Sequence, residues 1–417
     1  KSRLGDAESF KLRGTVQVWP AAAADRMTVA DIRNIVTDSN VEIIEISDTM
    51  IYYAEEKNEE GHNSLFILEY NRITRSERVI ANYFLNNPAF VQHYFSFPDM
   101  IIVVMENGSG VVWVMRLEKA TGRERNMAQI HFVGDYSSCT ALDESHVVFF
   151  TVENETDHEL FRTYQKLTGL NKVVYLYDLE QEKYFYIKDK RACSLGAENL
   201  VTYDVDGEKQ LLILQPYGDE QEKERCYRNA RWLGDNVSDR VWKCPLIDFF
   251  VAVKSGENKL PLGLCLSAGT DGLVRYAGMD SRNLYFRIKY YPTNDQRICA
   301  VEKRSGKKSV VAALNLGPDE QDAHFVIDTS AARIYRVREM EDGLCIDGVL
   351  NSSIHAKYSH ELGEFVSCVE DRILIARYVT SDENGPFEIS SIYDSQTGEQ
   401  KSFDGRCAVK GNTVVLY

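Results

Sequence analysis

The chain has 417 residues, of which 44 % are hydrophobic and 27 % are charged, a composition that can bury a large core. Its formal net charge of −15 disfavours nucleic acid as a partner, because phosphate binding requires a basic face. No stretch approaches the roughly 18 apolar residues of a membrane-spanning helix, so we expect no integral membrane segment.

Nine cysteines occur at wide spacings, and no two of them form a CxxC pair. Most lie in apolar runs, such as residues 264–266 and 344–346. We interpret them as buried, reduced thiols, which behave as small hydrophobic side chains and favour a cytoplasmic location. Because the first residue is Lys1, we keep open an extracytoplasmic location in which an N-terminal signal or anchor has been removed.

The first 40 residues precede the repeats that occupy the rest of the chain. Residues 11–19 include Thr-Val-Gln-Val-Trp at 15–19, which has the β-branched and aromatic character of a strand. Residues 28–36 predict a short helix with Thr28 as its N-cap. We expect residues 1–40 to provide a latch strand and a short helix.

A first phrase recurs along the chain: a short polar turn followed by an apolar run rich in β-branched and aromatic residues, which predicts a strand. Its copies are residues 48–53, 99–104, 144–150, 198–203, 282–288, 331–337, 371–376 and 411–417. Most steps between copies are about 40 to 50 residues, the spacing of propeller blades. One step is about twice as long, which predicts an insertion.

A second phrase follows the first in most repeats. It is an apolar run, an acidic or amide residue and a Thr-Gly or Ser-Gly turn, as in residues 117–123, 301–307 and 393–399. Glycine supplies positive φ and the short polar side chain caps the turn, so the phrase predicts a hairpin. Each repeat then forms four strands, from an inner strand to an outer one.

With these phrases the chain resembles bacterial β-propellers with short, degenerate repeats, over residues 41–417. The resemblance is to the architecture and to no single family, because the marks of WD40 and Kelch blades are missing. We predict an all-β fold in which residues 1–417 form one propeller of eight four-stranded blades, with seven as the alternative. The last copy stops midway at residues 414–417, so we expect residues 11–19 to complete that blade.

Two insertions break the strand rhythm, at residues 154–170 and 218–250, and both have helical character. In the second, three arginines recur at i, i+3 and i+6 beside aromatic residues, a composition typical of contact surfaces. The candidate partner-binding residues are Arg225, Tyr227, Arg228, Arg231, Trp232 and Trp242. The alternative is a solvated helix face, with the arginines paired to Glu222 and Glu224 and Trp232 packed on a blade.

Other motifs carry no chemistry that we can assign. Residues 203–208 include Asp206-Gly207 and predict a hairpin rather than a calcium loop. His355, His360 and Glu361 do not fit the spacing of a metal motif, and we predict no metal and no cofactor. We find no nucleophile elbow, phosphate loop or dinucleotide fingerprint.

The sequence leaves two classes of function open. The first is a non-enzymatic binding or scaffolding propeller that contacts a protein or another ligand through its insertions or its axial face. The alternative is a hydrolase or lyase acting on carbohydrate, with carboxylates at the central channel. Catalytic residues are not identifiable, and whether the protein is an enzyme stays open.

Overall fold

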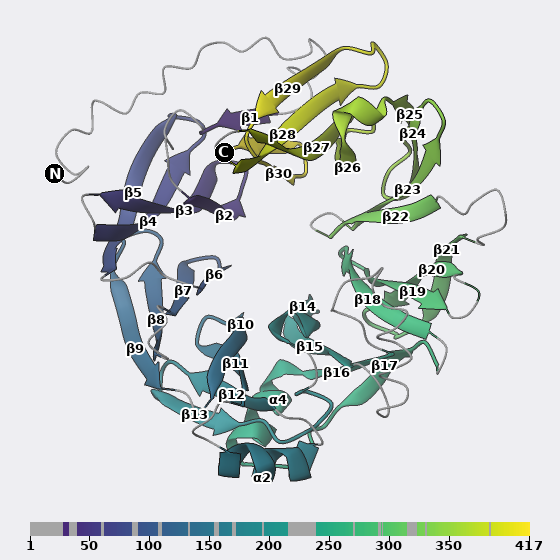
Figure 1. The fold of residues 1–417 in the computed structure, drawn as a ribbon. Coiled ribbons are helices and arrows are strands. Elements are labelled where there is room, and N and C mark those ends of the chain that lie inside the picture. The colour runs from purple at the N-terminus through teal and green to yellow at the C-terminus, as the bar shows by residue number, and fades with distance from the viewer. Residues whose placement is uncertain are drawn as a thin grey trace.

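The computed structural model describes most of the chain. The described residues are 28–32, 40–59, 62–85, 91–106, 111–131, 134–153, 158–168, 172–193, 196–215, 239–269, 272–290, 293, 295–314, 323–329, 332–382 and 385–417. They form eight β-sheets arranged in a ring, and Figure 1 shows the first strand of each blade nearest the centre. The eight-bladed propeller predicted from the repeats is confirmed.

Seven blades have four antiparallel strands in chain order, from inner to outer. Blade 1 is β2 (Asn40–Ile46), β3 (Met50–Glu59), β4 (His62–Asn71) and β5 (Ser76–Leu85). Blade 2 is β6 (Val91–Ser96), β7 (Met100–Glu106), β8 (Val111–Glu118) and β9 (Glu124–His131). Blade 3 is β10 (Asp135–Asp143), β11 (His146–Val152), β12 (Lys172–Asp178) and β13 (Lys183–Tyr186). Blade 4 is β14 (Leu200–Val205), β15 (Glu208–Gln215), β16 (Arg240–Pro245) and β17 (Gly263–Ser267).

The remaining four-stranded blades follow the same order. Blade 5 is β18 (Gly272–Met279), β19 (Asn283–Tyr290), β20 (Gln296–Glu302) and β21 (Lys308–Leu314). Blade 6 is β22 (Ala323–Asp328), β23 (Arg333–Met340), β24 (Gly343–Leu350) and β25 (His355–Tyr358). Blade 7 is β26 (Glu364–Val369), β27 (Ile373–Asp382), β28 (Gly385–Asp394) and β29 (Gln400–Asp404).

Blade 8 combines strands from both parts of the chain. It contains β30 (Cys407–Lys410), β31 (Thr413–Leu416) and β1 (Thr28–Asp31), and β1 pairs with β31 in parallel. The helix predicted at residues 28–36 is therefore wrong for Thr28–Asp31, because pairing with β31 outweighs the local cap signal of Thr28. The predicted latch at residues 11–19 lies outside the described residues.

The predicted hairpins form between the third and fourth strands and between the first and second. Gly122 and Gly306, of the Thr-Gly and Ser-Gly turns, have φ of 68° and 69°. A side chain at Gly122 would also meet the backbone oxygen of Ile80 at 2.5 Å. The Asp206-Gly207 turn joins β14 to β15 with φ of 54° and 86°, which confirms the hairpin.

Two α-helices occur among the described residues. The first, α2 (His158–Thr168), lies within the first predicted insertion and at the outer rim of the ring (Figure 1). The second, α4 (Leu246–Lys254), follows β16, and short 3₁₀ turns lie at Ala197–Asn199 and His360–Leu362. In the part of the chain that the structure describes, no helix has the length and apolar character to cross a membrane.

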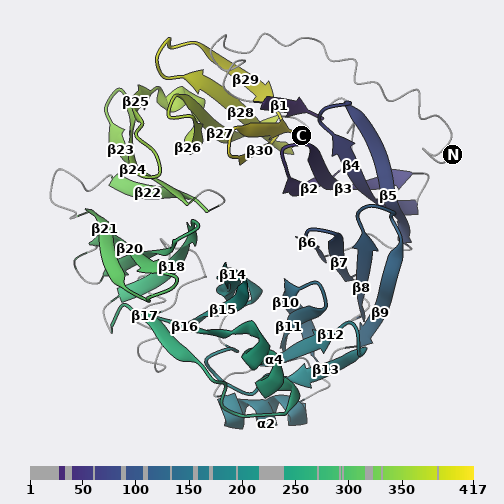
Figure 2. The ribbon, with the colours of Figure 1, turned by 180° about the vertical axis from the view of Figure 1, so that it is seen from behind.

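The core lies between neighbouring blades. The second and third strands hold most of the buried side chains, as in Met100–Met105 of β7, and these side chains pack against both adjacent blades. Figure 2, the view from behind, shows the same ring of blades. Of the eight cysteines that the structure describes, seven are buried and Cys407 is half-buried, as the sequence predicted.

Candidate functional site

The interface between blades 5 and 6 contains an apolar cluster. Tyr285 and Ile298 of blade 5 pack against Phe325 and Ile334 of blade 6. Ile298 stands opposite Arg287 in the strand register, so the apolar cluster extends along the interface. Because side chains alternate along a strand, the residues two and four places after Tyr285 must face the same interface.

The same face of blade 5 also carries cations. Arg287 and Lys289 follow Tyr285 in alternation along β19, and Arg275 of β18 stands directly opposite Arg287 in the strand register. Like charges at directly opposed positions destabilise a sheet. We call Arg275, Arg287 and Lys289 the basic cluster.

Arg287 is the central member of the basic cluster. Its Nη1 donates to the backbone oxygen of Phe325 at 3.3 Å, and its Nε has no hydrogen-bond partner among the described residues. Burial, with a smaller contribution from the charge of Arg275, lowers the pKa of Arg287 to about 10. Lys289 is buried, and burial together with Arg287 lowers its pKa too. The interface thus holds positive charge in a desolvated place.

Blade 6 adds two more arginines on the opposing face. Arg336 and Arg338 follow Ile334 in alternation along β23, and Arg336 is paired in register with Phe325. Both guanidinium groups contact Asp347 of β24, with Nη2–Oδ2 distances of 3.3 Å for Arg336 and 2.9 Å for Arg338.

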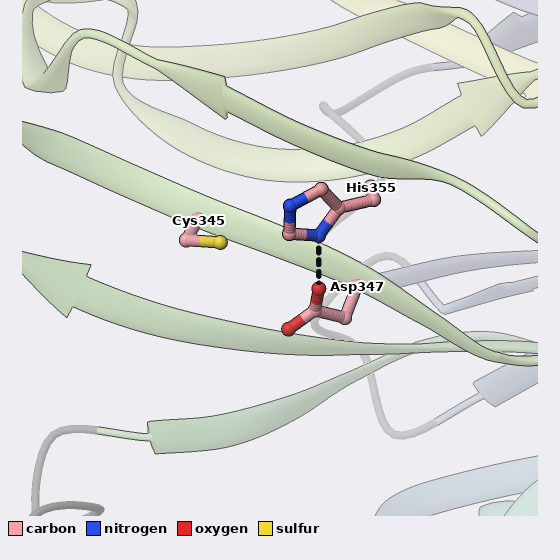
Figure 3. A group of neighbouring side chains, drawn as sticks. All are labelled: Cys345, Asp347 and His355. Atoms are coloured by element: carbon pink, nitrogen blue, oxygen red, sulfur yellow. Dashed lines mark hydrogen bonds and ion pairs between the residues drawn. The ribbon is translucent and has the colours of Figure 1, made fainter.

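Asp347 also belongs to a group with metal-ligating side chains. Figure 3 shows His355 pointing at Asp347, with 2.6 Å between Nδ1 and Oδ1, and Cys345 beside them. The candidate ligand atoms of Cys345, Asp347 and His355 lie within 4.8 Å of one another. Burial alone would raise the pKa of Asp347, but the hydrogen bond from His355 and the arginine charges lower it.

This group does not fit a metal ion. The two arginines already place two positive charges on its single carboxylate, and Arg338 Nη2 also lies 3.4 Å from Cys345 Sγ. A cation here would be repelled by both guanidinium groups. Of the histidines considered from sequence, His360 donates from Nε2 to the backbone oxygen of Met340, 3.0 Å away, and the structure does not bring it to this group.

The partner-binding residues predicted from sequence are mostly not placed. Arg225, Tyr227, Arg228, Arg231 and Trp232 lie outside the described residues. Trp242, expected in the insertion, lies on β16, the third strand of blade 4. Its Nε1 donates to Gln215 Oε1 at 2.6 Å, and the guanidinium of Arg191 lies 4.9 Å from its ring centre.

The basic cluster was missed by sequence reasoning. Its signal was nonetheless present: Arg287 and Lys289 interrupt the apolar run of a strand that the repeat places second in its blade. Cations inside a buried strand are rare unless they are paired, so such positions are informative.

Comparisons with known proteins leave the function open. No protein-family model and no curated protein matches the sequence. An oligogalacturonate lyase in complex with manganese is 11 % identical over 88 % of this chain and 96 % of that chain, with a TM-score of 0.40. The β-propeller domain of the Trilobed protease from Pyrococcus furiosus is 9 % identical over 87 % and 97 %, with a TM-score of 0.41.

A periplasmic gluconolactonase from Pseudomonas aeruginosa gives similar values. It is 12 % identical over 90 % of this chain and 97 % of that chain, with a TM-score of 0.41. At these identities the likeness concerns the propeller fold alone and assigns no ligand or reaction to this chain.

Proposed function

We propose that this chain is a non-enzymatic binding propeller that takes an anionic ligand, carrying a carboxylate or phosphate group, at the basic cluster between blades 5 and 6. The observation that carries this proposal is Arg287, a desolvated guanidinium that faces Arg275 across the sheet and contacts a backbone oxygen of blade 6.

The reason is the free-energy cost of burying positive charge. A buried cation is unfavourable unless a counter-charge or several hydrogen bonds compensate it. A guanidinium group presents a planar fork of donors that matches the oxygens of a carboxylate or a phosphate. An anion bound here would occupy donors such as the Nε of Arg287, which has no hydrogen-bond partner among the described residues.

The same residues favour binding over carbohydrate hydrolysis or elimination. Glycoside hydrolysis uses two carboxyl groups that flank the scissile bond. At this interface Asp347 is the carboxylate that the described contacts bring to the arginines, and two guanidinium groups and His355 already engage it. The basic cluster itself supplies positive charge and no carboxyl group.

Two further expectations stay proposals beside this one. Contact with a protein partner through Arg225–Trp232 would add a second surface, and it concerns residues outside the described part of the chain. A reducing, cytoplasmic location is supported by the free and mostly buried cysteines.

The test is calorimetric titration of the full chain with citrate and with inorganic phosphate. We expect one of the two anions to bind, with affinity falling as salt rises, and Arg287→Gln to weaken that binding about tenfold or more. Arg297→Gln is the matched control. Arg297 is exposed and stands opposite Ile288 in the register of β19 and β20, so it lies on the other face of the blade from Arg287. Equal affinity in wild type and Arg287→Gln, or no binding of either anion, would overturn the proposal.

A further inference from the structure

A second, separate site lies between blades 4 and 5, at the end of the ring that carries the turns between first and second strands. It is a pocket of about 370 Å³. We call it the charged pocket, and its lining residues are Asp204, Val205, Asp206, Ser281, Arg282, Glu302, Lys303 and Arg304. Its volume is near the lower end of the range for small-molecule sites, so an occupant must be small.

The two walls of the charged pocket carry opposite charge. Blade 4 contributes Asp204 and Asp206, from the end of β14 and the hairpin that follows it. Blade 5 contributes the basic residues Arg282, Lys303 and Arg304. Its one acidic residue, Glu302, is already neutralised, because Arg282 donates to its Oε1 from Nε at 2.9 Å and from Nη2 at 2.8 Å.

One ion pair connects the walls. Arg304 donates to Asp206 across the gap between the blades, and the two side chains are 77 % and 56 % exposed. Ion pairs as exposed as this one contribute only about 0 to 1 kcal/mol to the free energy of unfolding. A ligand can therefore separate Arg304 from Asp206 at a small free-energy cost.

The remaining charges are Asp204 and Lys303. Asp204 is exposed and has no ion-pair or hydrogen-bond partner among the described residues. Lys303 is half-buried, and its backbone nitrogen donates to the oxygen of Arg282 at 2.9 Å, which fixes the root of its side chain. Its Nζ lies 6.0 Å from the ring centre of Tyr203. Burial alone would raise the pKa of Asp280, but hydrogen bonds from Tyr285 and from backbone donors lower it, and the charge of Lys303 lowers it further.

We infer that the charged pocket binds a small zwitterion, of the size of an α-amino acid or a dipeptide. Its ammonium group lies against Asp204 and Asp206, and its carboxylate lies against Lys303 and Arg304. A ligand with only one kind of charge would leave a wall of like charge facing it, so both charges are needed for selection. This site does not depend on the basic cluster, which lies on the other face of blade 5.

Titration calorimetry of the full chain with the common α-amino acids and their glycyl dipeptides tests the inference. For the zwitterion that binds best, we expect acetylation of its amine and amidation of its carboxylate each to weaken binding about tenfold or more. We expect the same loss from Asp204→Asn and from Lys303→Gln. The matched controls are Glu208→Gln and Lys307→Gln, because both residues are exposed, lie in the same two hairpins and do not line the pocket.

All four side chains are exposed or half-buried and lie in or beside hairpin turns, so the variants are expected to keep the fold, and equal melting temperatures will verify this. Controls that bind as wild type, beside Asp204→Asn and Lys303→Gln variants that do not, would establish the site. Two results would overturn the inference: no zwitterion in the panel binds, or the acetylated and amidated analogues bind as well as the parent. Loss of citrate or phosphate binding in Arg287→Gln bears only on the basic cluster.

Discussion

The interfaces around blade 3 and the interface between blades 5 and 6 solve the same packing problem differently. Around blade 3, one large apolar cluster extends from blade 2 to blade 4 and includes both helices, through Phe161 of α2 and Phe249 of α4. Between blades 5 and 6, an apolar cluster shares the interface with the basic cluster, and Arg287 donates to the backbone oxygen of Phe325 on blade 6.

Charge is also handled differently in the two regions. Near blade 3, Lys254 of α4 donates to Asp178 Oδ2 at 2.6 Å, and His146 stacks on Phe250 with 3.9 Å between ring centres. There the charge of Lys254 meets an opposite charge and anchors a helix. In the basic cluster, Arg275 and Arg287 stand opposite each other in register, and the Nε of Arg287 has no hydrogen-bond partner among the described residues.

The largest expected effect on stability is the loss of apolar packing around blade 3. Phe249 is fully buried, so Phe249→Ala should lower the free energy of unfolding by about 3–5 kcal/mol, through lost burial and the cavity left behind. Urea unfolding followed by fluorescence measures this. The control is Phe84→Ala, at a side chain that is 79 % exposed, which should change the value by less than about 0.5 kcal/mol. Similar losses in the free energy of unfolding for both variants would show that Phe249 of α4 is not part of the core.

The second effect concerns the paired charge near blade 3. Burial alone would raise the pKa of Asp178, but hydrogen bonds from Lys254 and from the backbone lower it below its usual range. Asp178→Asn should therefore lower the free energy of unfolding by about 2 kcal/mol near neutral pH. Because the folded pKa is lowered, this stability is present above about pH 4 and is lost as the pH falls through the folded value.

Urea unfolding at neutral and acid pH measures that dependence. The difference between wild type and Asp178→Asn should shrink at acid pH, whereas Asp342→Asn, in an exposed turn, should match wild type throughout. A difference that grows on acidification would show that Asp178 is not stabilised in its charged form.

The smallest effect is expected in the basic cluster. Arg287→Met removes a desolvated charge and keeps an apolar side chain, so the free energy of unfolding should stay constant or rise by about 1 kcal/mol. Lys254→Met, which breaks the contact with Asp178, should instead lower it by about 1 to 2 kcal/mol. Thermal unfolding of the two variants side by side compares them directly. A larger loss in Arg287→Met would assign Arg287 to structure and not to ligand binding.

The sequence predicted the parts of the fold that local patterns determine. Residues 121–122 and 305–306 mark hairpins because only certain residues adopt the positive φ of those turns, and the repeat of such turns implies blades. The prediction from sequence failed at Thr28, where a helix was expected, because the strand there depends on a partner at Thr413 that no local pattern reveals. For the basic cluster, the sequence showed that Arg287 and Lys289 interrupt a buried strand, but the position of Arg275 opposite Arg287 depends on the strand register, which no local pattern reveals.

The parallel pairing of β1 with β31 has a consequence for biosynthesis. Thr28–Asp31 is made early, but its partner Thr413–Leu416 leaves the ribosome only after seven blades have been synthesised. During that interval β1 exposes an unpaired edge, which is a site for wrong strand pairing. Bringing the two segments together also closes a very long loop, and contacts of this kind slow folding. Until ring closure, a nascent chain of this protein therefore carries a strand edge that is open to aggregation.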